Sequence, residues 1–575
     1  MSLAVVRAAL RLSPRQVAYH LKRKGRNLLA ARFPLLYAWY VGRVAGAIPA
    51  IDLTGPGRAT ALELARVVAP YYEDEYREAM DDAAQGRFTF FAQTVDFGSP
   101  AEVDWHHTVD AEQDFHLWRM KLGHMGFVCP MLISGNEDHL AAVSELFASF
   151  RARADFGTPG CFSSYWFPYS ASHRILAVLS GYVLARDSRE LPEPLQAEIE
   201  EFLRWNAGFV LANIEHELRN NHVERNLAAL CLYFACVGSV PGRITRRLDR
   251  EVRRVIHACV LPDGLIAERS AMYQGLAVMA LGVFAQTPFL SEATRELAQT
   301  RHDSAVSAWL TMTHPDGEIA LFNDSWFGEV PKVGAVTAPG VAGPVGLLAD
   351  AGYARLEAGN VFVLMDAGPI GPRWNPGHGH ADFLAVEADI AGRRFVVDPG
   401  TYQYSTGPRR TFERSAQSHN GPVRDGLEPV EYAGCFRVGR MRAAQVLDFE
   451  AIPDGGSVKG RLGLPDGSAV ERAVTVLPGL IRVTDEWSRG GVGAQVRLTI
   501  PDGWQAAGRA DGRLSFTQGA DRAEIVVLDG TIAAVEAGDW SCEYLQSRVA
   551  TVVTLLPPAS AEKTARLVWE MRALS

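Results

Sequence analysis

The sequence predicts a protein of two structural parts, a helical part followed by an antiparallel β part. From about residue 60 to residue 345, apolar residues recur at helical spacing. Near residue 345 the apolar pattern changes to strand-length runs between Gly and Pro turns. The two patterns do not alternate along the chain. Because segregated helices and strands form separate domains, we expect a cleft between them, and such clefts are favoured ligand sites.

Length, charge and cysteine usage narrow the class of protein. The chain of 575 residues is long enough for two or more domains, each with its own core. Its formal net charge is −9 with both signs well mixed, which argues against a nucleic-acid partner, since such proteins carry a basic surplus. The seven cysteines include no CxxC pair, so we expect buried thiols rather than a disulfide-stapled scaffold.

Residues 1–55 are predicted to form a basic helical arm. Nine Lys and Arg residues precede the first acidic residue, Asp52. Arginines interrupt each early apolar run, so we expect no cleavable secretion signal. The apolar run from Phe33 to Val41 is too short to cross a bilayer, which takes about 20 residues. Two interpretations remain open: an amphipathic arm that contacts an anionic membrane, or a solvated helix pair packed on the body.

Residues 56–345 form the predicted helical domain. One apolar stripe runs from Ile199 to Val210, another from Leu227 to Phe234, and a third from Tyr273 to Phe284. Breaks such as Pro262-Asp263-Gly264 separate the helices. Many helices of similar length joined by short turns predict a ring or array of helical hairpins.

Residues 346–575 form the predicted antiparallel β domain, with a sandwich as the expected arrangement. The runs Tyr353 to Glu357 and Val361 to Met365 indicate one hairpin. The runs Val386 to Ile390 and Arg394 to Val397 indicate the next hairpin. Further strand-length runs follow to the end of the chain, a pattern typical of an all-β domain.

The most informative local pattern is Gly377-His378-Gly379-His380-Ala381-Asp382. The apolar alternation after it predicts the start of a strand, on which positions i and i+2 face the same side, about 7 Å apart. His378 and His380 are therefore expected to face one cavity. Asp398 and His419 are two further side chains of metal-ligand type, and imidazoles with a carboxylate are usual zinc ligands. The alternative is a set of polar residues on an exposed strand.

Two predicted helix starts in the helical domain carry further polar side chains. Asn221 is the predicted N-cap of one helix, in an approximate capping box, and His222 follows it. Ser270 is the predicted cap of a second helix, with Tyr273 in its first turn. Helix starts expose side chains and unpaired N–H groups to a cleft. Each residue alone can also be explained as an ordinary capping or core residue.

Together, the Asn221-His222 pair, Tyr273 and the His-Gly-His segment resemble the heparinase II/III-like polysaccharide lyases. The resemblance covers most of the chain after residue 100, and its most specific part is the run from His378 to Asp382. It implies an N-terminal incomplete (α/α) toroid followed by a C-terminal antiparallel β-sandwich. It also implies a carbon–oxygen lyase that cleaves a uronic-acid-containing acidic polysaccharide by β-elimination.

The resemblance implies a catalytic role for each matching residue. Asn221, helped by His378, would neutralise the substrate carboxylate. His222 and Tyr273 would share the roles of base and acid, in an order that depends on the sugar. Gln274 stands where many relatives are expected to have a histidine, which leaves acid–base assistance at that position open.

The resemblance also implies a structural Zn²⁺ held by His380, Asp398 and His419 near the cleft. Four arginines near this segment are candidate subsite residues for an acidic sugar chain, or equally surface residues: Arg373, Arg409, Arg410 and Arg414.

The implied substrate is a bacterial exopolysaccharide or a similar acidic polymer outside the cell. The cell envelope or periplasm is therefore the expected location, with the cytoplasm as the alternative because no signal peptide or membrane span is predicted. Two other functions remain open. One is a non-catalytic polysaccharide-binding protein of exopolysaccharide or capsule assembly, which needs the cleft but not the acid–base pair. The other is a hydrolase whose catalytic zinc is held by His378, His380 and Asp398, with His419 as a further ligand.

Overall fold

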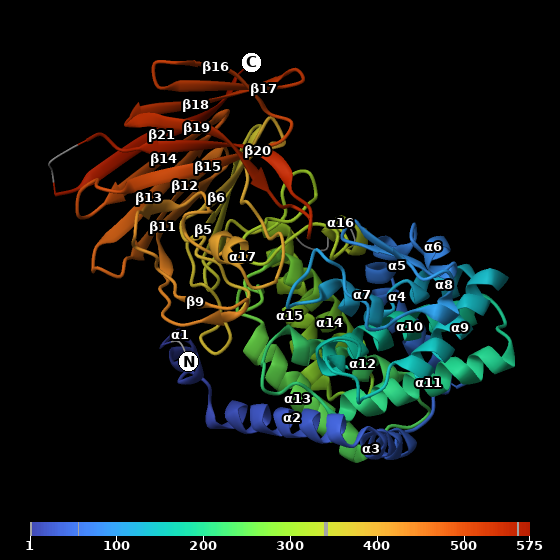
Figure 1. Cartoon of the computed structure of the whole chain (residues 1–575). Helices are drawn as coiled ribbons and strands as arrows, with labels where there is room; N and C mark the ends of the chain where they lie inside the picture. The colour runs from blue at the N-terminus through green and yellow to red at the C-terminus, as the bar shows by residue number, and fades with distance from the viewer. Residues whose placement is uncertain (1–2, 56, 338–342, 560–562, 575) are drawn as a thin grey trace.

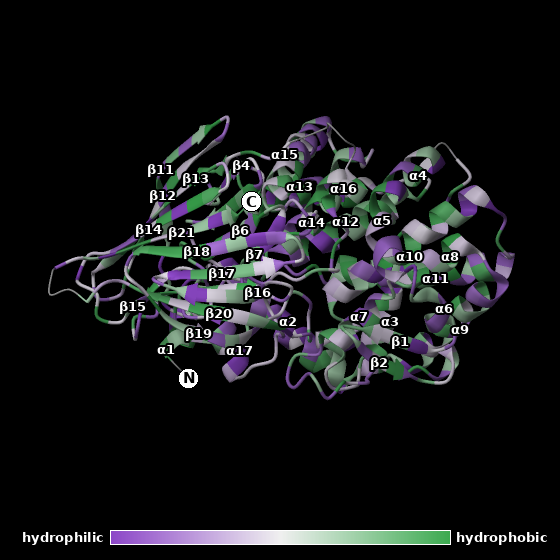
Figure 2. Ribbon diagram, turned by 90° about the horizontal axis from the view of Figure 1, so that it is seen from above, coloured by the Kyte–Doolittle hydropathy of each residue, from purple (hydrophilic) through white to green (hydrophobic). Residues whose placement is uncertain are grey.

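The structure is a computed structural model that describes residues 3–55, 57–337, 343–559 and 563–574. Helices occupy one half of the molecule and long β-sheets the other half (Figure 1). The view from above shows the strands side by side, with most of the helices gathered at the opposite end (Figure 2). The predicted order of a helical part and an antiparallel, sheet-rich part is confirmed. The domain boundaries stay predictions.

The N-terminal arm contains the helices α1 (Leu3–Ala9), α2 (Pro14–Arg32) and α3 (Pro34–Gly46). Ser13 caps α2, because its hydroxyl accepts a hydrogen bond from the N–H of Gln16. A proline in the first turn favours the start of both α2 and α3. Helix α1 contacts the β part, whereas α3 packs on α11 of the helical part. The arm therefore touches both halves of the molecule.

In the described residues of the helical part, one short β-hairpin lies among the helices. The elements of this part are α4 (Gly57–Val68), α5 (Pro70–Tyr76), α6 (Met80–Ala84), β1 (Arg87–Phe90), β2 (Gln93–Asp96), η1 (Pro100–Glu102), α7 (Leu117–His124), α8 (Val128–Ser134), α9 (Glu137–Arg153), η2 (Cys161–Ser163), α10 (Pro168–Ser188), α11 (Glu193–Ala212), α12 (Asn221–Ala235), α13 (Gly242–Cys259), α14 (Ala271–Gln286), α15 (Glu292–Thr311) and α16 (Val333–Val336).

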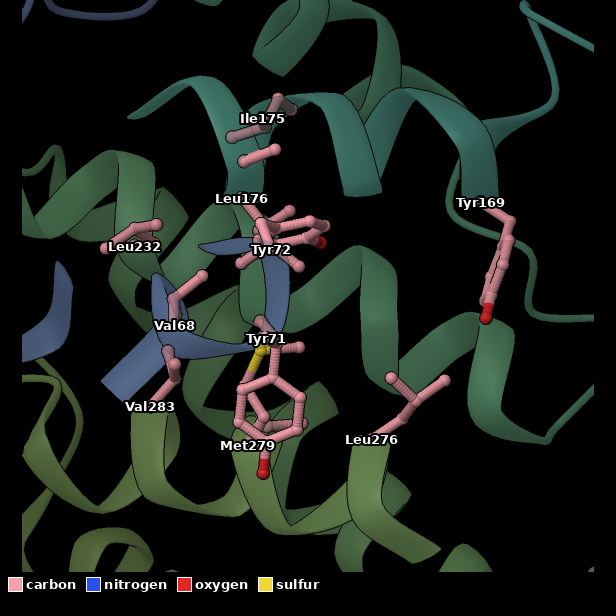
Figure 3. Close-up of a cluster of buried hydrophobic side chains, with 14 of the residues drawn as sticks. Val68, Tyr71, Tyr72, Tyr169, Ile175, Leu176, Leu232, Leu276, Met279 and Val283 are labelled. Carbon is pink, nitrogen blue, oxygen red and sulfur yellow. The ribbon is translucent and has the colours of Figure 1, made fainter. Parts of the chain in front are cut away.

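Helices α10 and α14 form the centre of the helical part. Almost all their residues are buried, and both helices contact α4 and α12. A helix that is apolar on every side belongs in a core. Figure 3 shows the cluster, which includes Val68, Tyr71, Leu176, Met279 and Val283. This packing holds α12 and α14 in place, and their N-terminal ends carry the candidate catalytic side chains.

The β part contains one short helix among its strands. Its elements are β3 (Leu347–Leu348), β4 (Tyr353–Ala358), β5 (Val361–Asp366), β6 (Val386–Ile390), β7 (Arg393–Val396), α17 (Pro408–Glu413), β8 (Pro422–Arg424), β9 (Tyr432–Ala433), β10 (Arg437–Val438), β11 (Ala444–Ile452), β12 (Gly455–Gly463), β13 (Ala469–Leu477), β14 (Leu480–Trp487), β15 (Ala494–Pro501), β16 (Gln505–Ala510), β17 (Arg513–Gln518), β18 (Asp521–Asp529), β19 (Thr531–Trp540), β20 (Arg548–Leu556) and β21 (Ala565–Leu574).

Most of these strands form three antiparallel sheets. Their strand orders are β3-β4-β5-β6-β7, β19-β20-β15-β8 and β11-β12-β13-β14-β21-β18-β17-β16. Both predicted hairpins are confirmed, since β4 pairs with β5 and β6 pairs with β7. Buried residues alternate along β14, which is typical of a sheet with one face on the core. That core includes Met365, Val386, Val474 and Trp569.

Buried polar contacts join the two parts. Nδ1 of His314, which follows α15, lies 2.8 Å from a carboxylate oxygen of Asp389 in β6. The hydroxyl of Tyr544, which follows β19, lies 3.4 Å from the carboxylate of Glu112, before α7. Because both contacts are buried, they favour one fixed arrangement of the two parts.

All seven cysteines are unpaired thiols, as predicted. None of the helices in the described ranges combines the length and the apolar character that crossing a membrane requires.

Candidate active site

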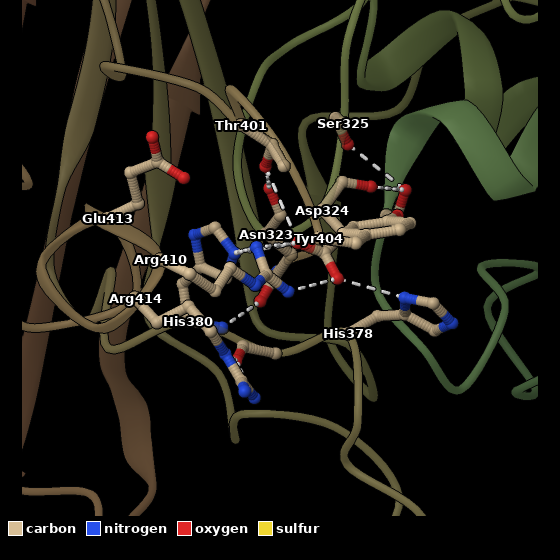
Figure 4. A network of polar contacts seen from close by, with 12 residues as sticks. Asn323, Asp324, Ser325, His378, His380, Thr401, Tyr404, Arg410, Glu413 and Arg414 are labelled. Atoms are coloured by element: carbon tan, nitrogen blue, oxygen red, sulfur yellow. Dashed lines mark hydrogen bonds and ion pairs between the residues drawn. The ribbon is translucent and has the colours of Figure 1, made fainter. Parts of the chain in front are cut away.

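The His-Gly-His segment lies in the loop between β5 and β6. The prediction that it begins a strand is wrong, because β6 begins only at Val386. Gly379 lets this loop approach its neighbour, since a Cβ there would collide with a backbone carbonyl. Both imidazoles nevertheless reach one partner: His378 Nδ1 and His380 Nε2 each lie 2.9 Å from an oxygen of Asp324 (Figure 4).

Asp324 is the centre of this cluster, and the sequence analysis missed it. Arg410 of α17 donates hydrogen bonds of 2.6 and 2.8 Å to its two oxygens. Burial favours the neutral acid, but Arg410, His378 and His380 outweigh it and hold the pKa of Asp324 well below its usual value. Asp324 is therefore a carboxylate that fixes both imidazoles. The sequence signal that could have pointed to Asp324 was the polar run Asn323-Asp324-Ser325 after a buried apolar segment.

The two histidines differ in what they face. His380 is fully buried, and its pKa falls to about 3, because burial and the nearby Arg410 outweigh Asp324. His378 is 9 % exposed, and its ring centroid lies 4.5 Å from that of Tyr273 in the helical part. Its Nε2 lies 3.7 Å from the carboxylate of Glu268. His378 is therefore the imidazole of the pair that meets Glu268 and the first turn of α14.

Asn221 is the first residue of α12, and the prediction that it caps this helix is wrong. The cap is Asn220, whose extended backbone lets its side-chain oxygen accept from the N–H of His222 at 3.2 Å. The side chain of Asn221 therefore does not cap the helix. It is 4 % exposed, and neither its amide nitrogen nor its amide oxygen has a hydrogen-bond partner among the described residues. Such a group is costly unless a ligand or water completes it.

Glu268 connects Asn221 to the histidine loop. Its carboxylate accepts from the backbone N–H of Asn221 at 3.1 Å and from the amide of Asn220 at 3.3 Å. The same carboxylate faces His378 Nε2. The sequence analysis gave Glu268 no role. A carboxylate two residues before a helix cap was the available signal.

Tyr273 lies in the first turn of α14, and Ser270 caps this helix as predicted, with its hydroxyl accepting from the N–H of Tyr273 at 3.2 Å. The Tyr273 hydroxyl lies 3.1 Å from that of Tyr404, which the sequence analysis did not single out. Burial, followed by the nearby Tyr169, raises the pKa of Tyr273 well above its usual value. At neutral pH it is therefore a neutral hydroxyl and a proton donor.

His222 is held from two sides. Its Nδ1 lies 3.1 Å from the carboxylate of Glu215, and its ring centroid lies 4.4 Å from that of Tyr169. The side chain keeps 16 % of its surface exposed. Glu215 can thus fix the tautomer and the ring orientation, which leaves Nε2 as the nitrogen for chemistry.

Gln274 has a structural role. Its amide donates to the carbonyls of Gly264 and Ala305 at 3.0 and 2.9 Å. Its oxygen accepts from the N–H of Ile266 at 2.8 Å. The side chain ties α14 to a neighbouring turn and to α15, so it takes no part in the cluster around Tyr273.

The predicted zinc residues fit a metal ion only in part. One carboxylate oxygen of Asp398 lies 2.6 Å from His419 Nδ1, and the other accepts a hydrogen bond from the N–H of Gly400 at 3.0 Å. His380 Nδ1 and His419 Nε2 are buried without partners among the described residues, and the two ring centroids lie 5.4 Å apart. Within the described ranges, no group of three or more His, Cys, Asp or Glu side chains is arranged to hold a metal. The zinc site stays a prediction.

The four candidate subsite arginines differ in burial: two are buried and two are not. Arg410 and Arg414 are almost completely buried. Arg410 donates to Asp324, and Arg414 donates to the carbonyls of Gly377 and Gly379 at 3.0 and 3.1 Å. They hold the histidine loop, so their prediction as substrate contacts is corrected. Arg409 is partly exposed and pairs with Asp539, 2.8 Å away, on the surface of the β part.

Arg373 lines a basic cavity of about 770 Å³. Trp374 is also in its wall and donates its indole N–H at 3.0 Å to the carbonyl of Arg219, two residues before Asn221. The cavity therefore adjoins the start of α12. None of the described residues that line it is acidic, and its arginines are Arg7, Arg11, Arg269, Arg373, Arg440 and Arg442.

A further cation lies inside the helical part, one turn after His222. Arg225 is fully buried, and none of its three guanidinium nitrogens has a hydrogen-bond partner among the described residues. Nε2 of His124 and of His173 also lack partners there, and the two rings stack 4.5 Å apart. Burial, with help from nearby cations, lowers the pKa of both histidines well below the usual value. Sequence analysis missed this group, which carries no motif.

Comparisons with known proteins support the fold. Residues 341–570 match the family model of the heparinase II/III-like C-terminal domain. A crystal structure of heparinase III matches at a TM-score of 0.67, with 15 % identity, over 91 % of this chain and 93 % of that chain. The heparan sulfate lyase HepC from Pedobacter heparinus matches at a TM-score of 0.55, with 15 % identity, over 95 % of this chain and 88 % of that chain. A search of curated protein sequences finds no match.

Residues 341–570 are a heparinase II/III-like C-terminal domain, and the fold of the whole chain is similar to that of heparinase III. Heparinase II/III-like enzymes are polysaccharide lyases, which are carbon–oxygen lyases. The family model covers residues 341–570, and for this part of the chain the resemblance predicted from the sequence is confirmed. At 15 % identity the solved structures establish the fold.

Proposed function

We propose that this protein cleaves a uronic-acid-containing acidic polysaccharide by β-elimination. The observation that carries the proposal is the buried amide of Asn221, whose nitrogen and oxygen have no partner among the described residues. Glu268 joins this residue to His378, and His378 contacts Tyr273. A donor, an imidazole and a hydroxyl from three separate elements thus surround one polar region at the interface of the two parts.

Asn221 and His378 would bind the carboxylate of the uronic acid. The proton on C5, next to this carboxylate, is very weakly acidic while the group keeps its full charge. An amide N–H and an imidazole N–H that donate to the carboxylate stabilise the enolate-like charge that develops. Asp324, held by Arg410, fixes the His378 ring for this contact.

His222 and Tyr273 would carry out the two proton transfers. We assign His222 Nε2 as the base, since Glu215 occupies its Nδ1. The base removes the C5 proton, the C5–H electrons form the C4=C5 double bond, and the C4–O bond breaks. Tyr273 donates its proton to the leaving glycosidic oxygen, a role suited to a hydroxyl of raised pKa. Tyr404 positions Tyr273 from the β part.

An acidic substrate fits the charge around the site. The arginine-lined cavity at Arg373 and Trp374 adjoins the start of α12 and offers cations and an indole surface to a neighbouring sugar. Inside the helical part, the guanidinium of Arg225, which has no hydrogen-bond partner among the described residues, offers a second place for a carboxylate or a sulfate. We propose both as subsites for the acidic chain, and the cell envelope as the place where the protein meets it.

The proposed architecture is an incomplete (α/α) toroid with a β-sandwich, and it includes a structural Zn²⁺ at His380, Asp398 and His419. The buried His380 Nδ1 and His419 Nε2, which have no hydrogen-bond partner among the described residues, support the metal. A bound zinc would tie together the loops around β7 and β8. A chelator should then lower the melting temperature of the wild type but not of His419→Ala, whereas equal effects on both would remove the proposal.

The experiment that tests the proposed function is a panel of uronic-acid polymers of several linkage types. A lyase releases products with an unsaturated uronic end, which absorb in the ultraviolet. Binding of the same polymers without an absorbing product would instead favour the non-catalytic polysaccharide-binding alternative. The absence of both binding and product across the panel would remove the proposal.

A further inference from the structure

Helix α2 packs on the body of the protein with its polar side. Gln16 is 1 % exposed and donates its amide to the carbonyl of Glu217 at 3.2 Å. Arg23 pairs with the carboxylate of Glu217 at 3.1 Å, and Arg26 donates to the side chain of Asn213 at 2.8 Å. A surface helix ordinarily turns its apolar side to the core. The orientation of α2 is the reverse.

The apolar side of α2 and much of α3 face outward. Of the 20 exposed large hydrophobic residues in the described chain, 11 lie between residues 3 and 40. Leu28 of α2 is 72 % exposed, and Leu35 and Trp39 of α3 are 85 % and 63 % exposed. The two helices follow one another along one edge of the molecule (Figure 1). A concentration of apolar surface on this scale marks an interaction site.

The same segment is strongly basic. Residues 1–51 contain nine Lys and Arg residues and no Asp or Glu, although the whole chain has a net charge of −9. Five of these cations are exposed on or beside the apolar face: Arg15, Lys22, Lys24, Arg32 and Arg43. The partner of this face must therefore accept apolar side chains and cations together.

We propose that the outer face of α2 and α3 binds the surface of an anionic lipid bilayer. The leucines and Phe33 would enter the boundary between headgroups and acyl chains, and the exposed cations would contact lipid phosphates. Trp39 and Tyr40 are the aromatic types that favour this boundary. With 13 residues, α3 is shorter than the roughly 20 that a span requires, and α2 carries basic residues along its length. Both helices would therefore lie in the plane of the membrane.

The charge of this face favours an anionic bilayer over a second copy of the chain as its partner. Symmetric pairing through this face would bring the cations of both copies together without an acidic residue between them. A bilayer with anionic headgroups supplies the opposite charge over the whole face. The proposal is independent of the proposed lyase activity.

The test uses the full-length protein in flotation with vesicles of phosphatidylcholine, with and without about 30 % phosphatidylglycerol. We expect binding to the anionic vesicles at least about tenfold tighter than to the neutral ones, and weaker at high salt. The triple variant Leu35→Gln, Leu36→Gln, Trp39→Gln should bind at least about tenfold more weakly, because glutamine keeps the helix but removes the apolar area. Lys22→Gln with Lys24→Gln should reduce the preference for anionic vesicles.

The matched control is Val492→Gln with Val549→Gln, which removes two exposed valines of the β part, 91 % and 73 % exposed. This variant should bind vesicles like the wild type. Circular dichroism shows whether each variant keeps its helices. Equal vesicle binding by the wild type and a folded triple variant would overturn the proposal. Absence of vesicle binding by the wild type would do the same, as would a dimer that the triple variant converts to monomers.

Discussion

The hydroxyl of Tyr273 lies 3.1 Å from the hydroxyl of Tyr404, so one polar contact joins a helix of the first part to a loop of the second. The backbone N–H of Tyr404 donates to the hydroxyl of Tyr544 at 3.0 Å, and that hydroxyl in turn reaches Glu112 at 3.4 Å. The proposed acid is therefore positioned by both halves of the molecule, and its geometry depends on their docking.

Replacing Tyr273 with Phe should lower kcat by about 10²–10⁴-fold, because the variant keeps the ring and loses the proton donor. KM should change little, since the hydroxyl is assigned to proton transfer rather than to binding. Initial rates of ultraviolet-absorbing product measure both constants. Tyr404→Phe is the matched control, with a smaller loss expected because this tyrosine only positions Tyr273. A Tyr273→Phe rate within a few fold of the wild type would contradict the assignment.

Asn221→Ala should reduce kcat/KM by about 10²–10³-fold, because the amide is assigned to stabilising the developing charge on the carboxylate. The adjacent Asn220→Ala serves as the comparison. It removes a helix cap, which costs about 1 kcal/mol of stability. Asn220→Ala should therefore lower the melting temperature but have little effect on the rate. If the two variants show the same pattern, Asn221 has only a structural role.

Arg410→Met should destabilise the protein by about 3–5 kcal/mol, because it leaves the buried charge of Asp324 without its main partner. Adding Asp324→Asn should recover part of this loss, since the uncompensated charge is then gone. Urea unfolding of the single and double variants measures the difference. Additive losses would show that the ion pair is not the cause.

Glu112 should make folding stability depend on pH. Burial, partly offset by N–H donors from Trp118 and Leu117, raises the pKa of its carboxyl from 4.5 to about 7. Between these values the folded protein holds more protons than the unfolded chain, so this contribution to stability falls as pH rises from about 4.5 to about 7. Glu112→Gln cannot ionise and keeps an acceptor oxygen.

Relative to the wild type, Glu112→Gln should therefore gain stability with rising pH, by up to about 3 kcal/mol, because one pKa unit corresponds to about 1.4 kcal/mol. Unfolding free energies from urea titrations at pH 5 and pH 8 give this difference directly. Parallel values for the two proteins across that range would show that Glu112 ionises normally.

The sequence predicted those site residues that belong to a local pattern. His378 and His380 formed a motif, and Asn221, His222 and Tyr273 lay at helix starts; the structure brings these segments together, while their roles stay predictions. The predicted strand was wrong because apolar alternation after Asp382 does not say where pairing begins. The prediction that Asn221 caps α12 was wrong because two adjacent asparagines have the same capping side chain. Only the backbone conformation selects Asn220.

By itself, the sequence determined the order of a helical part and a β part, the free thiols and the basic arm, because periodicity and composition are local properties. Only the tertiary structure decided that Asp324 and Glu268 join the histidine loop to the helix starts, and that Arg410 and Arg414 lie behind it. It also decided that α2 turns its leucines outward. Periodicity shows that a helix has two faces, but what packs against each face depends on residues distant in the chain.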